Sequence, residues 1–211
     1  RSRRYRRWWR RGAATTTTTN LTGTNYVEQA KINSDGSVGT FSAGNSTGLP
    51  AGGISRFQLL AYNGYLYIID GSTTDTSGTT VSNAIYYTRV TSESFNAFAN
   101  GAQLVNWSNT TTNVPTSARY DYAATVYNGY MYIAGGRTGS SYTTGLLTDV
   151  SYSQLLPSGL PGTWSATTAL PAARFGMDLQ PYNGHLYIVG GNLGGGAAGG
   201  TLTETVLYSS V

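Results

Sequence analysis

The stretch Tyr127-Asn128-Gly129-Tyr130-Met131-Tyr132-Ile133-Ala134-Gly135-Gly136 decides the fold, because close copies of it occupy residues 62–71 and 182–191. Each copy predicts a strand, an Asn-Gly turn, a second strand and a glycine pair that ends it. Asn-Gly is favoured in two-residue hairpin turns because both central residues need a positive φ. The chain is therefore expected to be built from repeated β-hairpins.

The residues around this phrase repeat in step with it. Upstream of each turn lie an arginine, a proline and an aromatic residue, and downstream lies a strand with a tyrosine. These markers are Arg56, Arg119 and Arg174; Pro50, Pro115 and Pro171; Phe41, Trp107 and Trp164; and Tyr87, Tyr152 and Tyr208. Because all of them shift together along the chain, the repeating unit is expected to contain four strands.

The three copies resemble the kelch repeat, and the middle copy, from Arg119 to Trp164, matches its pattern best. The resemblance covers residues 24–211. It implies an all-β protein, a β-propeller of four-stranded antiparallel blades. In such blades the glycine pair leaves room near the central channel, and Tyr and Trp pack between neighbouring blades. Two positions depart from the pattern: Asp70 replaces a glycine, and Phe41 stands where the other copies have tryptophan.

Counting strands predicts about three blades and an incomplete ring. The chain is expected to open with a third and a fourth strand at 26–32 and 38–41, and to end on a third strand at 204–211. A propeller closes with about four to eight blades, and its two ends normally complement one another within one blade. Here the ends duplicate a strand. We therefore expect an excerpt or processed piece of a longer propeller, or a subunit, partnered by further propeller blades or other copies of the chain.

The composition favours an extracellular or cell-surface scaffold. Only 10% of the 211 residues are charged, against roughly 25% in ordinary globular domains. Threonine, serine, asparagine and glycine take their place, as is common outside cells. The chain has no cysteine, so a disulfide framework is excluded within it.

The positive charge is concentrated at the start of the chain. Residues 1–11 hold seven of the thirteen basic residues, followed by a threonine-rich linker at 12–23 and the kelch-like region at 24–211. Three interpretations stay open for this segment: binding of nucleic acid, binding to an anionic membrane, and a solvated basic leader. Its candidate polyanion-binding residues are Arg3, Arg4, Arg6, Arg7, Arg10, Arg11, Trp8 and Trp9.

Catalytic chemistry has little support in the sequence. The only histidine, His185, stands where the other two copies have tyrosine, and no catalytic residue, metal site or cofactor is expected. Asp121 and Asp178 would suit glycoside hydrolysis as a pair, but they lie at different offsets from the repeated arginines. A structural role in every blade is expected for these arginines, Arg56, Arg119 and Arg174.

Binding is expected on the loops between strands, because loops vary while the frame stays constant. The candidate residues are Ser140, Ser141 and Tyr142 in one loop and Asn192 in another. The predicted function is a non-enzymatic module that binds a protein or glycan partner or forms a surface assembly. Two alternatives remain: part of a glycan-processing enzyme with its active site in other blades, and a structural protein with a nucleic-acid- or membrane-binding arm.

Overall fold

The computed structural model describes residues 26–47, 49, 53–73, 80–90, 105–112, 115, 117–195 and 200–210. Within these ranges the chain forms strands and no helix, which confirms the predicted all-β class. The strands are β1 (Tyr26–Gln29), β2 (Ser42–Thr47), β3 (Gln58–Tyr62), β4 (Tyr65–Ser72), β5 (Val81–Arg89), β6 (Val105–Asn106), β7 (Ser108–Thr110), β8 (Ala123–Tyr127), β9 (Tyr130–Ala134), β10 (Val150–Leu155), β11 (Pro161–Thr167), β12 (Asp178–Tyr182), β13 (His185–Val189) and β14 (Val206–Ser210). The basic segment 1–11 and the linker 12–23 lie outside the described residues.

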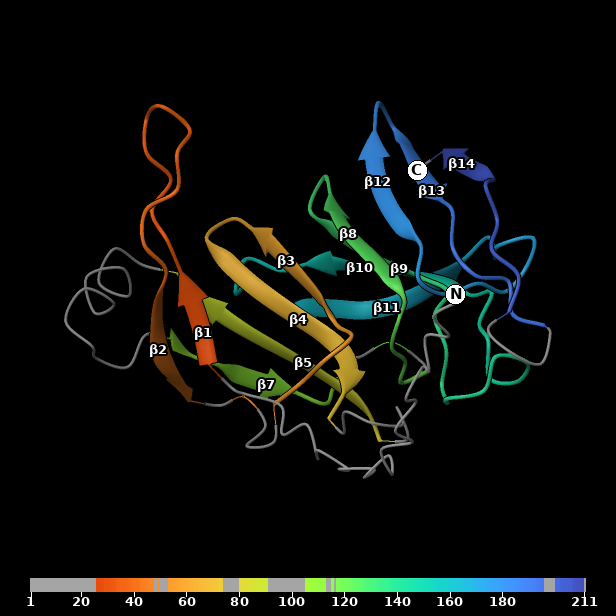
Figure 1. Ribbon diagram of the computed structural model, residues 1–211, viewed down its shortest axis with the longest axis horizontal. Coiled ribbons are helices and arrows are strands. Elements are labelled where there is room, and N and C mark those ends of the chain that lie inside the picture. Colours follow the sequence, from red (N-terminus) through yellow and green to blue (C-terminus); the bar gives the residue numbers. More distant parts are fainter. Residues whose placement is uncertain are drawn as a thin grey trace, which may run out of the picture.

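These strands form four sheets, which Figure 1 shows side by side in chain order from β1 and β2 to β12–β14. Sheet I has the order β3-β4-β5-β7, sheet II the order β8-β9-β10-β11, and sheet III the order β12-β13-β14. All three are antiparallel. The leading sheet joins the β1–β2 hairpin to β6, which runs parallel to β2.

The three Asn-Gly turns adopt the predicted left-handed backbone. The φ angles are 47° and 78° at Asn63 and Gly64, and the two later turns have similar values. In each sheet the residues on either side of the turn pair directly, such as Tyr62 with Tyr65. The turn therefore sets the register of the first two strands.

The glycines after the second strand allow close approach between neighbouring sheets. The amide of Gly136 donates a hydrogen bond to the carbonyl of Arg174 in the next sheet, with an N···O distance of 2.8 Å. The amide of Gly71 does the same to Arg119 at 3.0 Å. A Cβ on Gly135 would lie 2.5 Å from the Arg174 carbonyl oxygen, so a side chain there would push the two sheets apart.

Apolar side chains fill the space between each sheet and the next. The cluster between sheets I and II has Tyr67 and Met131 at its centre, with Trp164 of β11 packed against it. Trp107, which precedes β7, packs with Ile68 and Val27 between sheet I and the leading sheet. Both tryptophans therefore pack against the sheet that precedes their own.

Two expected strand positions at the start of the chain were wrong. The second strand of the leading hairpin covers Ser42–Thr47 rather than residues 38–41, and β1 ends at Gln29. Between them the chain makes a single bridge, Ile32 with Val38. The aromatic side chain of Phe41 is 64% exposed, because no described sheet precedes the leading one to cover it.

Candidate binding site at the loop end of the sheets

The structure corrects the alignment of the repeated arginines. Isolated bridges join Ser55 to Ser72, Tyr120 to Arg137 and Phe175 to Asn192, each time directly after the glycine pair or, in the first copy, after Asp70-Gly71. Ser55, Tyr120 and Phe175 therefore occupy equivalent positions in the three repeats. The residues directly before them are equivalent to one another as well. Arg119 and Arg174 therefore correspond to Ile54, and the prediction that Arg56 shares their role was wrong.

The two equivalent arginines are buried and bind within their own sheets. Arg119 donates to the carbonyl of Gly135 at 3.0 Å and to both carboxylate oxygens of Asp149, at 3.1 and 2.5 Å. Arg174 donates to the carbonyl of Gly190 at 3.2 Å and to Oγ1 of Thr205 at 3.3 Å. With no carboxylate in that set, burial lowers the pKa of Arg174. Each arginine side chain thus hydrogen-bonds both to the glycine that follows the second strand of its sheet and to the loop that leads to the third strand.

Asp70 is a buried acid next to this network. Its side chain is fully buried, its φ is 51°, and both carboxylate oxygens lack a hydrogen-bond partner. The nearest cation is Nε of Arg119, 3.9 Å from Oδ2. Burial raises the pKa of the Asp70 carboxyl to about 8, although Arg119 acts in the opposite direction.

Backbone hydrogen bonds link equivalent positions of the three sheets, each just before the first strand of its sheet. The amide of Asp121 donates to the carbonyl of Arg56 at 3.3 Å, and the amide of Gly176 donates to the carbonyl of Asp121 at 2.7 Å. The φ angles of these residues are 56°, 53° and 65° in chain order. Two side-chain-bearing residues are thus held in a conformation that favours glycine, which is a common mark of functional segments.

Side chains at this end gather around one guanidinium. The ring centroids of Phe175, Tyr120 and Tyr142 lie 4.5, 4.9 and 5.1 Å from Cζ of Arg137. Asp121 accepts from Nε and Nη2 of Arg137 at 2.9 and 2.7 Å. Together with Arg56 these residues form what we call the Arg137 cluster: Arg56, Tyr120, Asp121, Arg137, Tyr142 and Phe175.

Only part of the Arg137 cluster faces solvent. Arg137 is 5% exposed, whereas the Asp121 side chain is 22% exposed and that of Arg56 37%. Nη1 of Arg56 lies 3.6 Å from Oδ2 of Asp121, and its guanidinium lies over the ring of Tyr120. Tyr142, whose ring lies against Arg137 and Phe175, is 40% exposed. The cluster can therefore offer an aromatic face, a carboxylate and a guanidinium to a polar ligand, with Arg137 fixing their positions.

The four predicted binding residues divide between the Arg137 cluster and its supporting loops. Tyr142 belongs to the cluster, and the carbonyl of Ser140 accepts from Nη1 of Arg137 at 3.4 Å. Ser141 instead accepts from the amides of residues 143 and 144 and so holds its own loop. Asn192 is buried, and its Oδ1 accepts from the amide of Gly194 at 2.8 Å. The eight predicted polyanion-binding residues lie outside the described residues.

The sequence did not single out Arg137, Tyr120 or Phe175 as site residues. Arg137 directly follows the glycine pair, where the other copies have Ser72 and Asn192. Because the residue at this position differs between the copies, comparing the repeats gave no reason to select it. The usable signal was the aromatic residue after each buried arginine, because both of these rings cover the Arg137 guanidinium.

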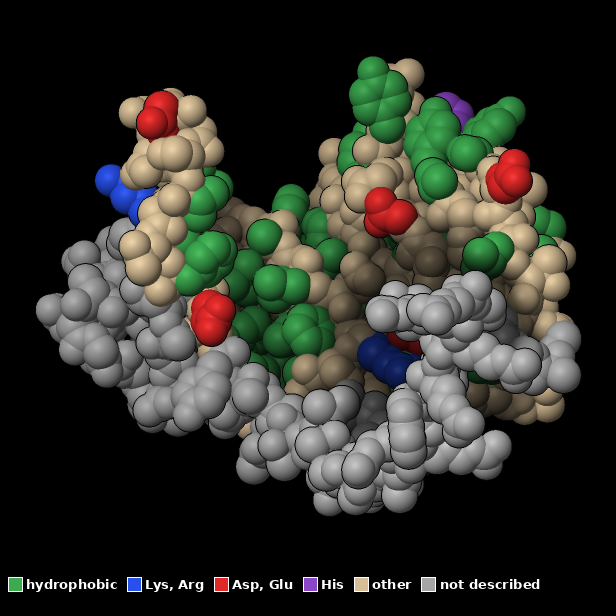
Figure 2. All heavy atoms as spheres, viewed as in Figure 1, with side chains coloured by type: hydrophobic (Ala, Val, Ile, Leu, Met, Phe, Trp, Pro, Cys, Tyr) green, Lys and Arg blue, Asp and Glu red, His purple; other side chains and the backbone are tan. Residues whose placement is uncertain are grey.

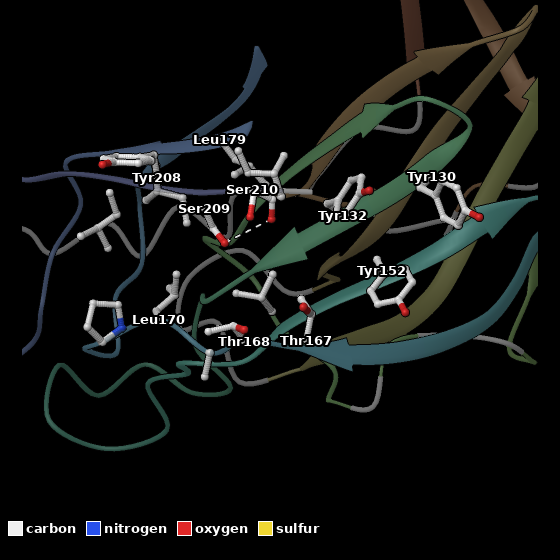
Figure 3. A pocket seen from close by; sticks show the side chains of 16 residues that line it. Tyr130, Tyr132, Tyr152, Thr167, Thr168, Leu170, Leu179, Tyr208, Ser209 and Ser210 are labelled. Carbon is white, nitrogen blue, oxygen red and sulfur yellow. Dashed lines mark hydrogen bonds between the residues drawn. The ribbon is translucent and has the colours of Figure 1, made fainter. Parts of the chain in front are cut away.

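A pocket of about 660 Å³ lies at a different place, between sheets II and III. Figure 3 shows Tyr130, Tyr132 and Tyr152 on one side of it and Ser209 and Ser210 of β14 on another. Aliphatic side chains, a proline, two threonines and Tyr208 complete its lining, and no charged residue takes part. The pocket is therefore mainly apolar, with tyrosine, threonine and serine hydroxyl groups in its lining.

Other parts of the described chain carry no sign of a metal centre. His185 packs against the rings of Tyr187 and Tyr208, and its Nδ1 lies 2.9 Å from the carbonyl oxygen of Asn183. Across the described ranges, no three His, Cys, Asp or Glu residues gather as a metal site would require. The same ranges contain no helix of the length and apolar character needed to span a membrane.

The comparisons with known proteins bear on the fold alone. No protein-family model matches the chain, and no curated protein matches it. Among solved structures, that of a protein called YjhT is similar, with a TM-score of 0.56 and 18% sequence identity. The alignment covers 81% of this chain and 46% of that one, so the chain spans about half the length of the structure it matches.

Proposed function

We propose that the chain is part of a kelch-like β-propeller that acts as a non-enzymatic binding module, with the Arg137 cluster as its ligand site. Three consecutive antiparallel sheets in chain order, Asn-Gly turns and close approach at the glycine pairs all support a propeller arrangement. Its further blades, or other copies of the chain, would complete the ring.

The observation that carries the binding function is the exposed half of the Arg137 cluster. Nη1 of Arg56 lies 3.6 Å from Oδ2 of Asp121, and the exposed ring of Tyr142 packs on Arg137 in the same cluster. A guanidinium and a carboxylate can donate to and accept from sugar hydroxyls, and a tyrosine ring can cover the apolar face of a sugar. Arg137 and its three rings hold these groups in place before a ligand arrives, which lowers the cost of ordering them on binding.

The ligand that best fits these groups is a neutral glycan chain. With two arginines and one aspartate, the Arg137 cluster carries a net charge of only +1, which disfavours a strongly basic partner and gives little attraction for a strongly acidic one. The low content of charged residues agrees with a place outside the cell or on its surface, where such glycans occur. In this proposal the groups bind and orient the sugar, and no bond is broken.

A glycan microarray of neutral oligosaccharides, followed by titration calorimetry, tests the proposal. We expect micromolar to millimolar binding of at least one glycan, and Tyr142→Ala is expected to weaken it at least tenfold. Tyr182→Ala is the matched control, because Tyr182 is exposed but lies next to an Asn-Gly turn, away from the cluster. Absence of binding across the array, or equal effects of the two variants, would contradict the proposed site.

A further inference from the structure

Asp70 departs from the repeat at a position where an acid is costly. The other two copies have Gly135 and Gly190 there, and the φ of 51° at Asp70 lies in the left-handed region that favours glycine. Figure 2 shows several Asp and Glu side chains apart from one another at the surface of the molecule, whereas the side chain of Asp70 is fully buried. A buried acid on a strained backbone is a common mark of a functional position.

Arg119 cannot serve as a hydrogen-bond partner of Asp70 while its present bonds last. Its Nε donates to the carbonyl of Ser117 at 3.0 Å. Its Nη1 donates to the carbonyl of Gly135 and to Oδ1 of Asp149, and its Nη2 donates to Oδ2 of Asp149. Each nitrogen of the guanidinium therefore already has an acceptor, and Asp149 balances its charge. A charged Asp70 would be a second carboxylate beside one arginine, buried and without a hydrogen bond.

Among the described residues, three charged or titratable groups act on Asp70, and all come from the segments that lead into β8 and β10. Burial raises the pKa of the Asp70 carboxyl, Arg119 acts in the opposite direction, and Asp149 adds to the rise. The third group is the hydroxyl of Tyr122, whose own pKa is raised by burial, so it stays protonated. Asp70 therefore keeps its proton at pH values where an exposed aspartate is charged.

The residues that follow Asp70 make the main-chain contacts of this junction. The amide of Gly71 donates to the carbonyl of Arg119 at 3.0 Å, which joins sheet I to sheet II. Ser72 and Ser55 exchange two hydrogen bonds, each with an N···O distance of 2.9 Å. A movement of the Asp70 backbone would therefore act on both contacts.

These two contacts lead directly to the exposed half of the Arg137 cluster. Arg56 follows Ser55 in the chain, and Asp121 lies two residues after Arg119. The amide of Asp121 donates to the carbonyl of Arg56 at 3.3 Å, and their side chains approach to 3.6 Å. The relative position of these two side chains thus depends on the junction beside Asp70.

We propose that Asp70 is a proton-dependent latch between sheets I and II. With the carboxyl protonated, the contact between Gly71 and Arg119 is closed, and Arg56 and Asp121 are held together. Loss of the proton leaves a buried charge without a partner, and the contact opens so that the carboxylate reaches water. The latch would also make ligand affinity fall as the pH rises, and this consequence alone rests on the proposed function.

The junction between sheets II and III has the same contacts without the acid. The amide of Gly136 donates to the carbonyl of Arg174 at 2.8 Å, and the amide of Gly176 donates to the carbonyl of Asp121 at 2.7 Å. A glycine stands in this junction at the position of Asp70. The second junction is therefore an internal control for the first.

Amide hydrogen exchange of the whole chain, followed by NMR from pH 5 to pH 7, tests the latch. The protection factor compares each amide with an unstructured peptide at the same pH, which removes the base catalysis of exchange itself. Opening that releases one proton becomes about tenfold more favourable per pH unit between the ordinary and the raised pKa of the carboxyl. The protection of the Gly71 and Asp121 amides is expected to fall about a hundredfold over this range, while that of Gly136 and Gly176 stays constant.

Two substitutions at Asp70 remove the titrating group. Asp70→Asn keeps the size of the side chain and tolerates the left-handed backbone, and it should make the protection of the Gly71 amide equal at pH 5 and pH 7. Asp70→Gly introduces the residue of the other copies and serves if the asparagine variant misfolds. Asp178→Asn is the matched control, because it removes an exposed acid of β12 and should leave the pH dependence as in the parent.

Three results would overturn the proposal. One is a parallel loss of protection at both junctions, which would mean that the whole chain unfolds. Another is a pH dependence that persists in both Asp70 variants, which would assign it to a different group. The third is a response of the Gly71 amide without one at Asp121, which would separate the junction from the Arg137 cluster. Because the measurement uses no glycan, failure of the latch and failure of the proposed ligand site are distinguishable.

Discussion

The hydroxyl oxygen of Tyr127 accepts a hydrogen bond from the backbone amide of Gly184 at 3.3 Å, and so joins sheet II to the Asn-Gly turn of sheet III. The hydroxyl oxygen of Tyr62 likewise lies next to the turn of the following sheet, 3.6 Å from the position that a Cβ on Gly129 would take. Tyr182 is the third tyrosine of this series, and it is 72% exposed. The tyrosine before each Asn-Gly turn therefore contacts the next sheet when one is present.

Tyr127→Phe is expected to lower the free energy of unfolding by about 0.5–1.5 kcal/mol, because the Gly184 amide loses its acceptor. Tyr182→Phe is the control and should change it by less than about 0.5 kcal/mol, as exposed substitutions do. Urea unfolding followed by far-ultraviolet circular dichroism measures both. A larger effect at Tyr182 would mean that its hydroxyl has a partner in solution.

Trp107→Ala is expected to destabilise the fold by about 3–5 kcal/mol, since this side chain is 6% exposed between two sheets. Trp164→Ala should cost less, because Trp164 is only partly buried where it packs on its cluster. Tyr208→Ala removes an aromatic side chain that is 72% exposed and should be nearly neutral. Thermal unfolding of the three variants should reproduce this order, and equal melting temperatures would contradict the assigned packing between sheets.

Gly135→Ala is expected to cost about 2–4 kcal/mol. The new Cβ would lie 2.5 Å from the Arg174 carbonyl oxygen, and the residue has a φ of 56°. Gly184→Ala is the control: its φ is 74°, and no atom lies within 4 Å of the added carbon, so only the backbone strain of about 1 kcal/mol remains. Chemical denaturation of both variants separates steric contact from backbone strain, and equal losses would show that the sheets can move apart at Gly135 without penalty.

Asp70→Asn is expected to change how stability depends on pH. The folded-state pKa of about 8 lies above the ordinary value of 3.8, so between these values the folded chain keeps a proton that the unfolded chain releases. The free energy of unfolding therefore falls as pH rises from about 4 to 8. The neutral amide removes this dependence, so the substitution should stabilise the chain more at pH 8 than at pH 5. Melting temperatures of both proteins at the two pH values check the sign, and a parent that becomes more stable over this interval would contradict it.

Removing residues 1–11 is expected to abolish salt-sensitive binding to DNA or to anionic vesicles. Seven arginines lie in this segment, and the rest of the chain carries six basic and nine acidic residues, a net charge of −3. For seven neutralised phosphates, the logarithm of the binding constant should fall with the logarithm of salt concentration at a slope of about −6. Fluorescence anisotropy over a salt series measures this, and unchanged binding by the shortened chain would exclude the segment as the site.

The sequence was sufficient to predict the all-β class, the Asn-Gly turns and the four strands of sheets I and II. The reason is that turn chemistry and strand alternation are local, and three copies repeat them. The prediction was wrong where the repeats were aligned by matching residue types, because the strand pairing of the structure gives a different alignment. Arg56 was matched to Arg119 because both precede an aromatic residue, but the bridges after the glycine pairs place Ile54 at that position.

The candidate site was less predictable than the frame. Tyr142 and Ser140 were expected on a variable loop, and both contact Arg137. The enclosure of Arg137 depends on Tyr120 from the same sheet and Phe175 from the next, which are 55 residues apart in the chain. The aromatic residue after each buried arginine is a local signal, but the meeting of the two rings around Arg137 arises from the packing of two sheets.

The hydrogen bonds that link Arg56 to Asp121 and Asp121 to Gly176 join main-chain atoms only. Every residue except proline has both of these groups, so a newly duplicated unit would arrive with its connection to both neighbours already in place. Arginine, aspartate and glycine can therefore occupy equivalent positions without loss of the connection. A gene that grows by tandem duplication can in this way add a unit first and change its loop side chains later, with no need for matched mutations on the two sides of the new junction.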